Sequence, residues 1–384
     1  MDFRLTEEQE MIRKMCHEFT DDVIMPRAEQ MDKTGEYPYD IIEQMAELGL
    51  MGIPFPEEYG GSGGDWVSMH LAIEEISRGD CTLGALLDVT TSVVAQELYV
   101  FSTEEQKKKW LIPIAKGEAI GAFGLTEPDA GSDAGATKTT AALDGDEWVI
   151  NGTKQFITNI GLDNASLVII TARCRRSEDG KDIINTFIVP KGTSGFTLGK
   201  RYDKMGWMSS ATNECIFENC RIPRDYLLGE EGRGLAQHLA VLDTGRISVG
   251  AVSVGLAQAC LEAALSYAQQ RYQFGKPIYS YQGVSFKIAD MAMNIELARN
   301  IYLKAAWLKD NNLPHTLESS YAKLFASEMA ERVASDALQI HGGYGYMNEY
   351  PVSRYYKGAK LLQIVEGTSE IQRLVISRNL LNNG

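Results

Sequence analysis

The hydrophobic positions of the chain follow a helical period at both ends and a strand period in the middle. Over residues 6–116 apolar side chains recur every three or four positions, as on one face of a helix. Residues 39–50 predict one helix of this region, and the largely apolar residues 82–101 predict another that is buried. Short polar side chains predict helix starts. Thr6 with Gln9 has the spacing of a capping box, and Ser102 predicts the cap of the helix that follows it.

From about residue 119 the period changes to that of strands. The runs EWVINGTKQFIT, SLVIITARC, NTFIVPKG and NECIFENCRIP are separated by turn signals such as Asp144-Gly145. From Gly229 the pattern is helical again, and its longest stretches are 236–272, 282–311, 314–340 and 369–382. The predicted fold class is therefore α+β, in three domains. They are an N-terminal helical domain (1–118), a middle antiparallel β domain (119–228) and a C-terminal four-helix bundle (229–384).

Composition excludes some classes of partner. The chain has 384 residues and a formal net charge of -15, which argues against nucleic acid or an anionic membrane as a main partner. The N-terminal residues have no signal or transit character, and no apolar run approaches transmembrane length. We therefore expect a cytoplasmic protein.

The cysteines and histidines predict neither a metal site nor a disulfide. The six cysteines are scattered singly, and the five-residue spacing of Cys215 and Cys220 within one strand sends the two side chains to opposite faces. Five separate histidines lack the spacing of metal ligands. Reduced, mostly buried thiols and no metal are expected.

Glu366, near the end of the chain, is a candidate base. It precedes Gly367 and a helix start at which Ser369 and Gln372 have the spacing of a capping box. Apolar neighbours would raise its pKa by desolvation, while a helix N-terminus would favour the ion, a balance that suits a base at neutral pH. The alternative is a carboxylate that merely lies in a helix N-terminal turn.

The segment AFGLTEPDAGSDAGATKT (122–139) predicts a second functional site. A strand leads into a loop with two glycines and with hydroxyls that can bind an anion or a polar heterocycle, although turn-rich loops of this kind are common. No G-x-G-x-x-G follows a strand, so a Rossmann dinucleotide site is not supported.

Six motifs together resemble those of the acyl-CoA dehydrogenases, a flavoenzyme family. They are LTEPDAGSDAG, KQFITN, KMGWMSSATNECIFENCRIP, RYQFGKPIYSYQ, QIHGGYGY and VEGTSEIQRL, in family order from the first helix to the last. Glycine at position 245, in LDTGRIS, leaves Glu366 as the base, because some members place the base at that position. In this the chain is most similar to the short-chain, butyryl-type branch.

The resemblance implies an FAD site built from two subunits. Residues near the isoalloxazine ring are Phe123, Leu125, Thr126, Ser132, Phe156, Ile157 and Thr158, and Thr368 and Glu370 contact FAD beside the catalytic loop. Residues that would reach the FAD of a neighbouring subunit are Arg271, Phe274, Gln282, Gln339, Gly342 and Gly343. A homotetramer is expected on this basis.

The resemblance also implies the substrate contacts, which are Ser132, Asp243, Arg246 and Gly367. A helix ion pair is the alternative for Asp243 and Arg246. Val365 stands where the family commonly has Tyr, so the acyl pocket differs there. Asp88 lies on an apolar helix that would wall this pocket. Either it bonds a hydroxyl of Thr90 or Thr91 or faces solvent, or it is a second acid/base or recognition group.

The implied activity is FAD-dependent α,β-dehydrogenation of a short-chain, branched or alicyclic acyl-CoA to the enoyl-CoA. Glu366 would remove the α-proton while the β-hydrogen leaves as hydride, and an electron-transferring flavoprotein would receive the electrons. Three alternatives remain open. They are an enoyl-CoA reductase running the reverse reaction, a cyclic acyl-CoA dehydrogenase that uses Asp88 as an extra acid/base group, and a flavin-bearing protein without catalysis.

Overall fold

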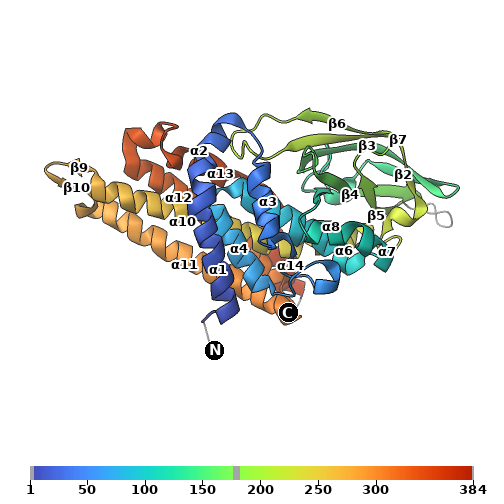
Figure 1. Ribbon diagram of the computed structural model, residues 1–384, viewed down its shortest axis with the longest axis horizontal. Coiled ribbons are helices and arrows are strands. Elements are labelled where there is room, and N and C mark those ends of the chain that lie inside the picture. The colour runs from blue at the N-terminus through green and yellow to red at the C-terminus, as the bar shows by residue number, and fades with distance from the viewer. Residues whose placement is uncertain (1–3, 176–181, 383–384) are drawn as a thin grey trace.

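The computed structural model describes residues 4–175 and 182–382, so the outermost residues of the first and last predicted domains lie outside it. Helices form both ends of the chain and a sheet forms its middle (Figure 1). The N-terminal helices are α1 (Glu7–Phe19), α2 (Met25–Thr34), α3 (Tyr39–Glu47), α4 (Trp66–Gly79), α5 (Cys81–Leu87), α6 (Gln96–Phe101), α7 (Glu104–Gln106) and α8 (Ile112–Ala115).

The apolar segment 82–101 is one buried helical run, as predicted, but its middle is wider than an α-helix. A π-helical stretch, η4 (Asp88–Ala95), joins α5 to α6. π-Helical stretches are rare in proteins, and those that occur often lie at functional sites. The capping box at Thr6 is confirmed. The cap predicted at Ser102 is wrong by one residue, because Thr103 accepts from the backbone of Gln106 and forms the capping box of α7.

The middle of the chain forms one sheet whose strands run in the order β6-β7-β3-β2-β4-β5-β8, with β1 paired to β4. Its strands are β1 (Ile120–Gly124), β2 (Thr140–Asp144), β3 (Glu147–Thr158), β4 (Ala165–Arg175), β5 (Asp182–Pro190), β6 (Phe196–Arg201), β7 (Thr212–Pro223) and β8 (Leu227–Leu228). The prediction of a purely antiparallel domain is wrong for β1, which runs parallel to β4. The long connection 125–164 makes this possible, since parallel neighbours need a crossover.

Cys215 and Cys220 do not point to opposite faces, because a bulge interrupts β7. Asn219 has a left-handed backbone, with φ 49°, and the pairing of β7 with β3 shifts register opposite Ile150 and Gly152. The extra residue of the bulge puts the two cysteine side chains on the same face of the sheet, where both thiols are fully buried. All six cysteines are free.

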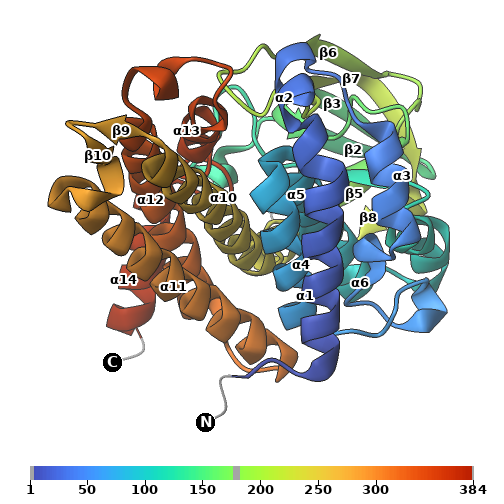
Figure 2. The same cartoon turned by 60° about the vertical axis from the view of Figure 1, so that its left-hand side comes forward.

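The C-terminal helices pack around α10 (Figures 1 and 2). They are α9 (Gly234–Ala240), α10 (Leu242–Gln270), α11 (Gln282–Asp310), α12 (Thr316–His341), α13 (Pro351–Leu361) and α14 (Ser369–Asn382), with a hairpin of β9 (Tyr272–Gln273) and β10 (Lys276–Pro277) after α10. The four predicted stretches match α10, α11, α12 and α14, with α12 one residue longer at its C-terminal end. The sequence analysis missed α13, although Pro351 at its first position is a typical helix start.

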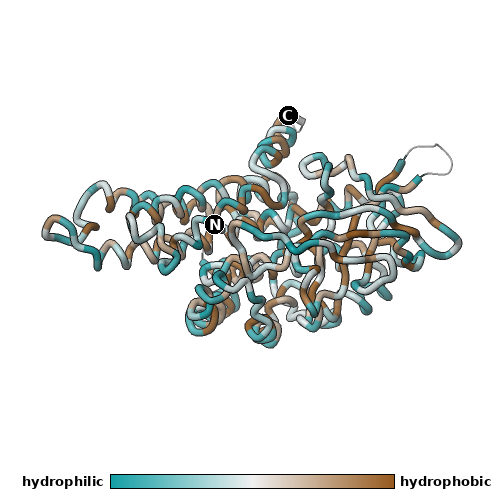
Figure 3. The backbone as a smooth tube through the Cα atoms, turned by 90° about the horizontal axis from the view of Figure 1, so that it is seen from above, coloured by the Kyte–Doolittle hydropathy of each residue, from teal (hydrophilic) through white to brown (hydrophobic). Residues whose placement is uncertain are grey.

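One helical stretch contradicts the expectation that no apolar run approaches transmembrane length. Gly234–Gln270 is long and apolar enough by composition, yet 83% of its most apolar window is buried inside the protein. It is the core of the bundle, contacted by α4, α11 and α12. Hydrophobic and hydrophilic residues are mixed along the helical part of the chain, and the helix that ends at the C-terminus, α14, projects from one side of the molecule (Figure 3).

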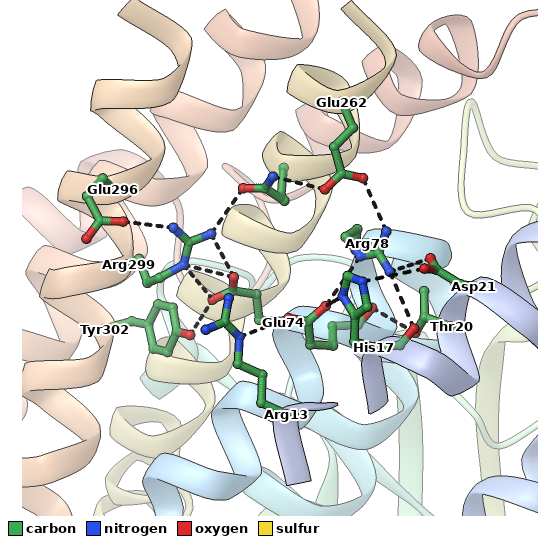
Figure 4. A network of polar contacts seen from close by, with 12 residues as sticks. Arg13, His17, Thr20, Asp21, Glu74, Arg78, Glu262, Glu296, Arg299 and Tyr302 are labelled. Atoms are coloured by element: carbon green, nitrogen blue, oxygen red, sulfur yellow. Dashed lines mark hydrogen bonds and ion pairs between the residues drawn. The ribbon is translucent and has the colours of Figure 1, made fainter. Parts of the chain in front are cut away.

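A polar network joins the N-terminal helices to the bundle (Figure 4). Glu74, on α4, accepts from Arg299 at 2.9 Å and from the hydroxyl of Tyr302, both on α11. Its neighbour Glu75 accepts from Arg13, on α1, at 3.2 Å. Because these carboxylates are buried and paired on two sides, they fix α4, and with it the segment that leads into η4.

Candidate active site

Glu366 lies in a tight turn before α14. Its φ is 53° and that of Gly367 is 92°, so two consecutive residues have left-handed backbones. A non-glycine residue in this region is strained and persists only where its surroundings hold it. Lys323 of α12 donates to the Gly367 carbonyl at 2.8 Å, and Gln372 of α14 donates to the carbonyls of both turn residues at 3.1 and 3.0 Å. These donors hold the turn.

The predicted capping box at Ser369 is wrong by one residue. The Thr368 hydroxyl accepts from the Ile371 N–H at 3.4 Å, so Thr368 caps α14. The Ser369 hydroxyl is buried without a partner, and Gln372 is a donor to the turn and not an acceptor from the cap. The predicted helix start itself is confirmed, and it places Glu366 just before the first turn of α14.

The Glu366 carboxyl points onto Gly245 of α10. A Cβ at position 245 would lie 2.1 Å from Glu366 Oε2, so only glycine leaves room for the carboxyl in this position. The residue as a whole is half-buried, but Oε2 is out of contact with water and has no hydrogen-bond partner among the residues that the structure describes. Burial raises the pKa of Glu366, while Asp88, Lys323 and Arg246 oppose the rise. A carboxyl of this kind suits a base that works near neutral pH.

Asp88 belongs to this site. It is 3% exposed, and its carboxyl group is in contact with that of Glu366. Within the described part of the chain its Oδ1 has no hydrogen-bond partner. The interpretation that it faces solvent or bonds a nearby threonine is wrong. The Thr91 hydroxyl donates to the Met51 carbonyl at 3.1 Å, and Thr90 accepts from Asn159 at 3.4 Å.

Asp243 and Arg246 form the helix ion pair that the sequence left open. Arg246 Nη1 lies 2.6 Å from Asp243 Oδ1, and the hydroxyl of Thr316 donates to the other carboxylate oxygen at 2.5 Å. The guanidinium of Arg246 is buried, and its Nε has no partner among the described residues. The pair therefore fixes a cation near Glu366.

The loop after β1 is held by an ion pair that the sequence analysis missed. Lys154 is fully buried on β3, lies 2.7 Å from Glu127 Oε1, and donates to the Leu125 carbonyl at 3.2 Å. Glu127 also accepts from the Thr139 N–H at 3.1 Å. The signal in the sequence was a lysine at a core position of a strand, in KQFITN. This pair positions the predicted cofactor residues Leu125 and Thr126.

The other residues predicted near the cofactor ring differ in exposure. Phe156 has φ 60° and breaks the β3–β7 register, which turns its ring outward to 57% exposure beside Tyr202. Ile157 is buried in the core at 2% exposure, so only its backbone is available. Thr158 ends β3 and is half-buried, whereas Ser132 is exposed on the loop.

Phe123 stacks on a histidine that the sequence analysis did not single out. The ring of His238, on α9, lies 3.7 Å from that of Phe123, and its Nδ1 bonds Glu97 at 2.8 Å. Both members of this pair are fully buried. No motif or spacing could have revealed it, because Glu97 and His238 lie in different domains of the sequence.

A second group of predicted residues lies at the far end of the bundle (Figure 1). Arg271 follows α10, and Phe274, in the hairpin turn, is 93% exposed. A cavity of 420 Å³ is lined there by Arg271, Gly342 and Gly343. Gln282 begins α11 and Gln339 is near the end of α12. Arg271 is 25 positions after Arg246, which at 1.5 Å per helical residue is about 37 Å. Within one chain this second group is therefore far from the catalytic end of α10.

Comparison with known proteins gives a match along nearly the whole chain. The models described as acyl-CoA dehydrogenase N-terminal, middle and C-terminal domains match residues 6–118, 122–220 and 232–381. A probable acyl-CoA dehydrogenase of Bacillus subtilis is 55% identical over 381 residues, which covers 99% of this chain and 100% of the relative.

Two solved structures match with a TM-score of 0.96. Butyryl-CoA dehydrogenase from Megasphaera elsdenii is 44% identical, with 99% of this chain and 100% of the other covered. A chain from the structure of the electron transferring flavoprotein of Acidaminococcus fermentans is 46% identical, with the same coverage.

Proposed function

The chain belongs to the acyl-CoA dehydrogenase family of FAD-dependent oxidoreductases, and on that premise we propose that it oxidises a short-chain acyl-CoA with Glu366 as the base. The observation that carries this assignment is the Glu366 carboxyl, held by a strained turn over Gly245 with its pKa raised by burial. The 44% identity to a butyryl-CoA dehydrogenase supports the short-chain substrate.

In the proposed reaction Glu366 takes the α-proton of the thioester. The turn donors Lys323 and Gln372 keep the carboxyl in place, so that the proton transfer needs little rearrangement. Bound FAD supplies the acceptor for the β-hydrogen, which leaves as hydride. Arg246 and Lys323 favour the carboxylate form of Glu366, the form that can accept a proton.

The described residues fit FAD. The outward ring of Phe156 and the loop anchored by Lys154 offer a surface for a flat ring system, at the sheet end of the molecule. At the far end, the cavity with Arg271 and two glycines suits an anionic phosphate group, because a guanidinium binds phosphate in a bidentate manner and glycine permits close approach.

We propose that two subunits complete each FAD site in a homotetramer. The separation of about 37 Å along α10 keeps the two groups of residues apart in one chain. Phe274 and Tyr346, near the second group, are 93% and 79% exposed, as expected of residues that another subunit covers. We further propose that an electron-transferring flavoprotein accepts the electrons, which is supported by the 46% identity to a chain from the structure of such a flavoprotein. We also propose a cytoplasmic location.

Glu366→Gln tests the assignment of the base. The amide has the same shape but cannot accept the α-proton, so turnover with butyryl-CoA should fall by about three orders of magnitude or more, the usual scale of general-base loss. Bound FAD, measured by its absorbance, should be unchanged. Glu105→Gln, an exposed substitution on α7, is the control. Near wild-type turnover in Glu366→Gln contradicts the assignment.

Flavin reduction under anaerobic conditions tests the substrate class. Butyryl, isobutyryl, hexanoyl, cyclohexanecarboxyl and glutaryl thioesters are compared at equal concentration. We expect the fastest bleaching with butyryl-CoA. A cyclohexanecarboxyl substrate faster than all linear ones would replace the short-chain proposal by the alicyclic one.

A further inference from the structure

Two buried carboxyl groups from distant parts of the chain touch in the active site. Asp88 lies at the start of η4 and Glu366 lies in the turn before α14. Each group has one buried oxygen without a hydrogen-bond partner, Oδ1 of Asp88 and Oε2 of Glu366. Two carboxylates cannot bond each other, because neither has a donor. One proton held between the two groups supplies the donor that both lack.

The charged neighbours decide which group keeps the proton. Lys323 of α12 and Arg246 of α10 both favour the ionised form of Glu366. For Asp88 burial and the carboxylate of Glu366 raise the pKa well above its ordinary value, with Ser248 as the remaining polar neighbour. The other ionisable side chains on the helices that flank η4 are Cys81, on α5, and Glu97 and Tyr99, on α6; Glu97 bonds His238.

The hydroxyl of Ser248 is turned away from Asp88 by a buried histidine. His70 Nδ1 lies 2.6 Å from the Trp66 carbonyl, which can only accept, so Nδ1 carries the ring proton. Burial lowers the pKa of His70 to about 4, so its Nε2 is an acceptor at neutral pH. The Ser248 hydroxyl has two acceptors, His70 Nε2 at 3.1 Å and the Thr244 carbonyl at 3.4 Å, and both direct its proton away from Asp88. A Ser248 hydroxyl engaged in this way does little to stabilise a carboxylate at Asp88, so Ser248 opposes the raised pKa of Asp88 only weakly.

We propose that Asp88 and Glu366 form a carboxyl pair that holds one proton at neutral pH, with the proton on Asp88. Asp88 is then a positioning residue. Its O–H donates to the Glu366 carboxylate, stabilises the ion that acts as base, and aims the other oxygen at the substrate. The α-proton moves from the substrate to Glu366, and Asp88 keeps its own proton. This inference rests on the proposed role of Glu366.

Two substitutions separate the role of the donor from that of packing. Asp88→Asn keeps a neutral donor of the same shape, whereas Asp88→Leu removes the donor and keeps the branching of the side chain, with two larger methyl groups in place of the oxygens. In the holoenzyme, the acid limb of kcat/KM against pH reports the pKa of the free base. We expect this limb unshifted in Asp88→Asn. In Asp88→Leu we expect it about one pH unit higher, which lowers kcat/KM about tenfold below the limb.

Infrared spectroscopy of the holoenzyme at neutral pH measures the proton directly. Wild type minus Asp88→Asn should show the carbonyl stretch of one protonated carboxylic acid, with a shift in D₂O. Absence of that band overturns the proposal. An acid limb that moves to lower pH in both variants also overturns the proposal, because that result identifies Asp88 as an anion. An acid limb that is unchanged in Asp88→Leu overturns it as well.

The spectroscopic arm keeps this inference separate from the proposed function. The band of Asp88 does not depend on turnover, so it can be present even if Glu366→Gln remains active and the assignment of the base fails. Conversely, if Glu366→Gln loses activity and the Asp88 band is absent, the shared proton is rejected while Glu366 remains the base. If Asp88→Leu does not fold, the band and the Asp88→Asn limb still decide.

Discussion

At the scale of single residues, the site depends on a missing side chain as much as on the carboxyl that fills its place. Gly245 lies in the first turn of the buried helix α10, and glycine within a helix costs up to about 1 kcal/mol relative to alanine. That cost is offset by function, because Glu366 Oε2 occupies the space of the absent Cβ. The glycine therefore serves the geometry of the base and not the stability of α10.

Gly245→Ala should lower turnover without unfolding the protein. The new Cβ would lie 2.1 Å from Oε2 and 3.0 Å from Val93, so the carboxyl must move while α10 gains helix propensity. A displacement of about 1 Å in a reacting group costs about a hundredfold in rate. We expect a loss of kcat on that scale with Tm nearly unchanged, measured by flavin reduction and thermal unfolding. Gly283→Ala, which has nothing within 4 Å, is the control, and equal kcat in both variants would contradict the placement of Glu366.

How far the sequence predicted these residues depends on what each one contributes. Glu366 and Gly245 were found because they belong to motifs that the chain shares with its family. Asp88 was found only as an unusual charge on an apolar helix, and two interpretations stayed open. Its neighbours decided between them, since contact with Glu366 and the orientation of Ser248 depend on η4, α10 and the α14 turn packing together. No local pattern contains that information.

At the scale of elements, the periods of hydrophobic residues predicted the type and order of the helices and strands. They did not predict features that depend on the position of a single residue. Two caps were displaced by one position, to Thr103 and Thr368. Left-handed residues in two strands, Phe156 and Asn219, shifted the alternation of side chains. Asparagine tolerates this conformation, but for Phe156 the sequence has no signal, because the strain is maintained by the surrounding sheet.

The loop between β1 and β2 should lose its anchor in Glu127→Gln. Burial alone would raise the pKa of Glu127, but Lys154 and two threonines hold it at about 2, below the ordinary 4.5. The ionisation of Glu127 therefore contributes fully above pH 4.5, by about 3 kcal/mol, and this contribution is lost as the pH falls toward 2. In Glu127→Gln the buried Lys154 has no anion, so stability at pH 7 should drop by about 3 kcal/mol, with weaker FAD retention.

Urea unfolding between pH 7 and pH 3 measures this effect. The difference between wild type and Glu127→Gln should shrink as the pH falls below 4.5. Glu147→Gln breaks the exposed pair with Arg221 on the neighbouring strands and should cost no more than about 1 kcal/mol. A similar loss in both variants would mean that the buried pair does not hold the loop.

At the scale of the whole molecule, the length of α10 separates the catalytic end of the chain from the proposed phosphate-binding residues, although the proposed reaction needs both in one site. Arg246 is at one end and Arg271 follows the other, about 37 Å away. The network around Glu74 ties α4 of the N-terminal helices to α11 of the bundle (Figure 4). If two subunits complete each FAD site, as proposed, the sequence of one subunit predicts the residues of that site but not how they come together.

Mixed oligomers test this arrangement. Arg271→Glu should lose FAD, because an anion replaces the cation at the phosphate cavity, and Glu366→Gln should lose turnover. If each site takes Glu366 from one subunit and Arg271 from another, co-expression gives mixed pairs in which one site of two carries neither substitution. With random mixing about a quarter of wild-type activity should return, because half of the pairs are mixed. Differently tagged chains isolate the mixed oligomers. If each FAD site lies within one subunit, no mixture of the two variants regains activity.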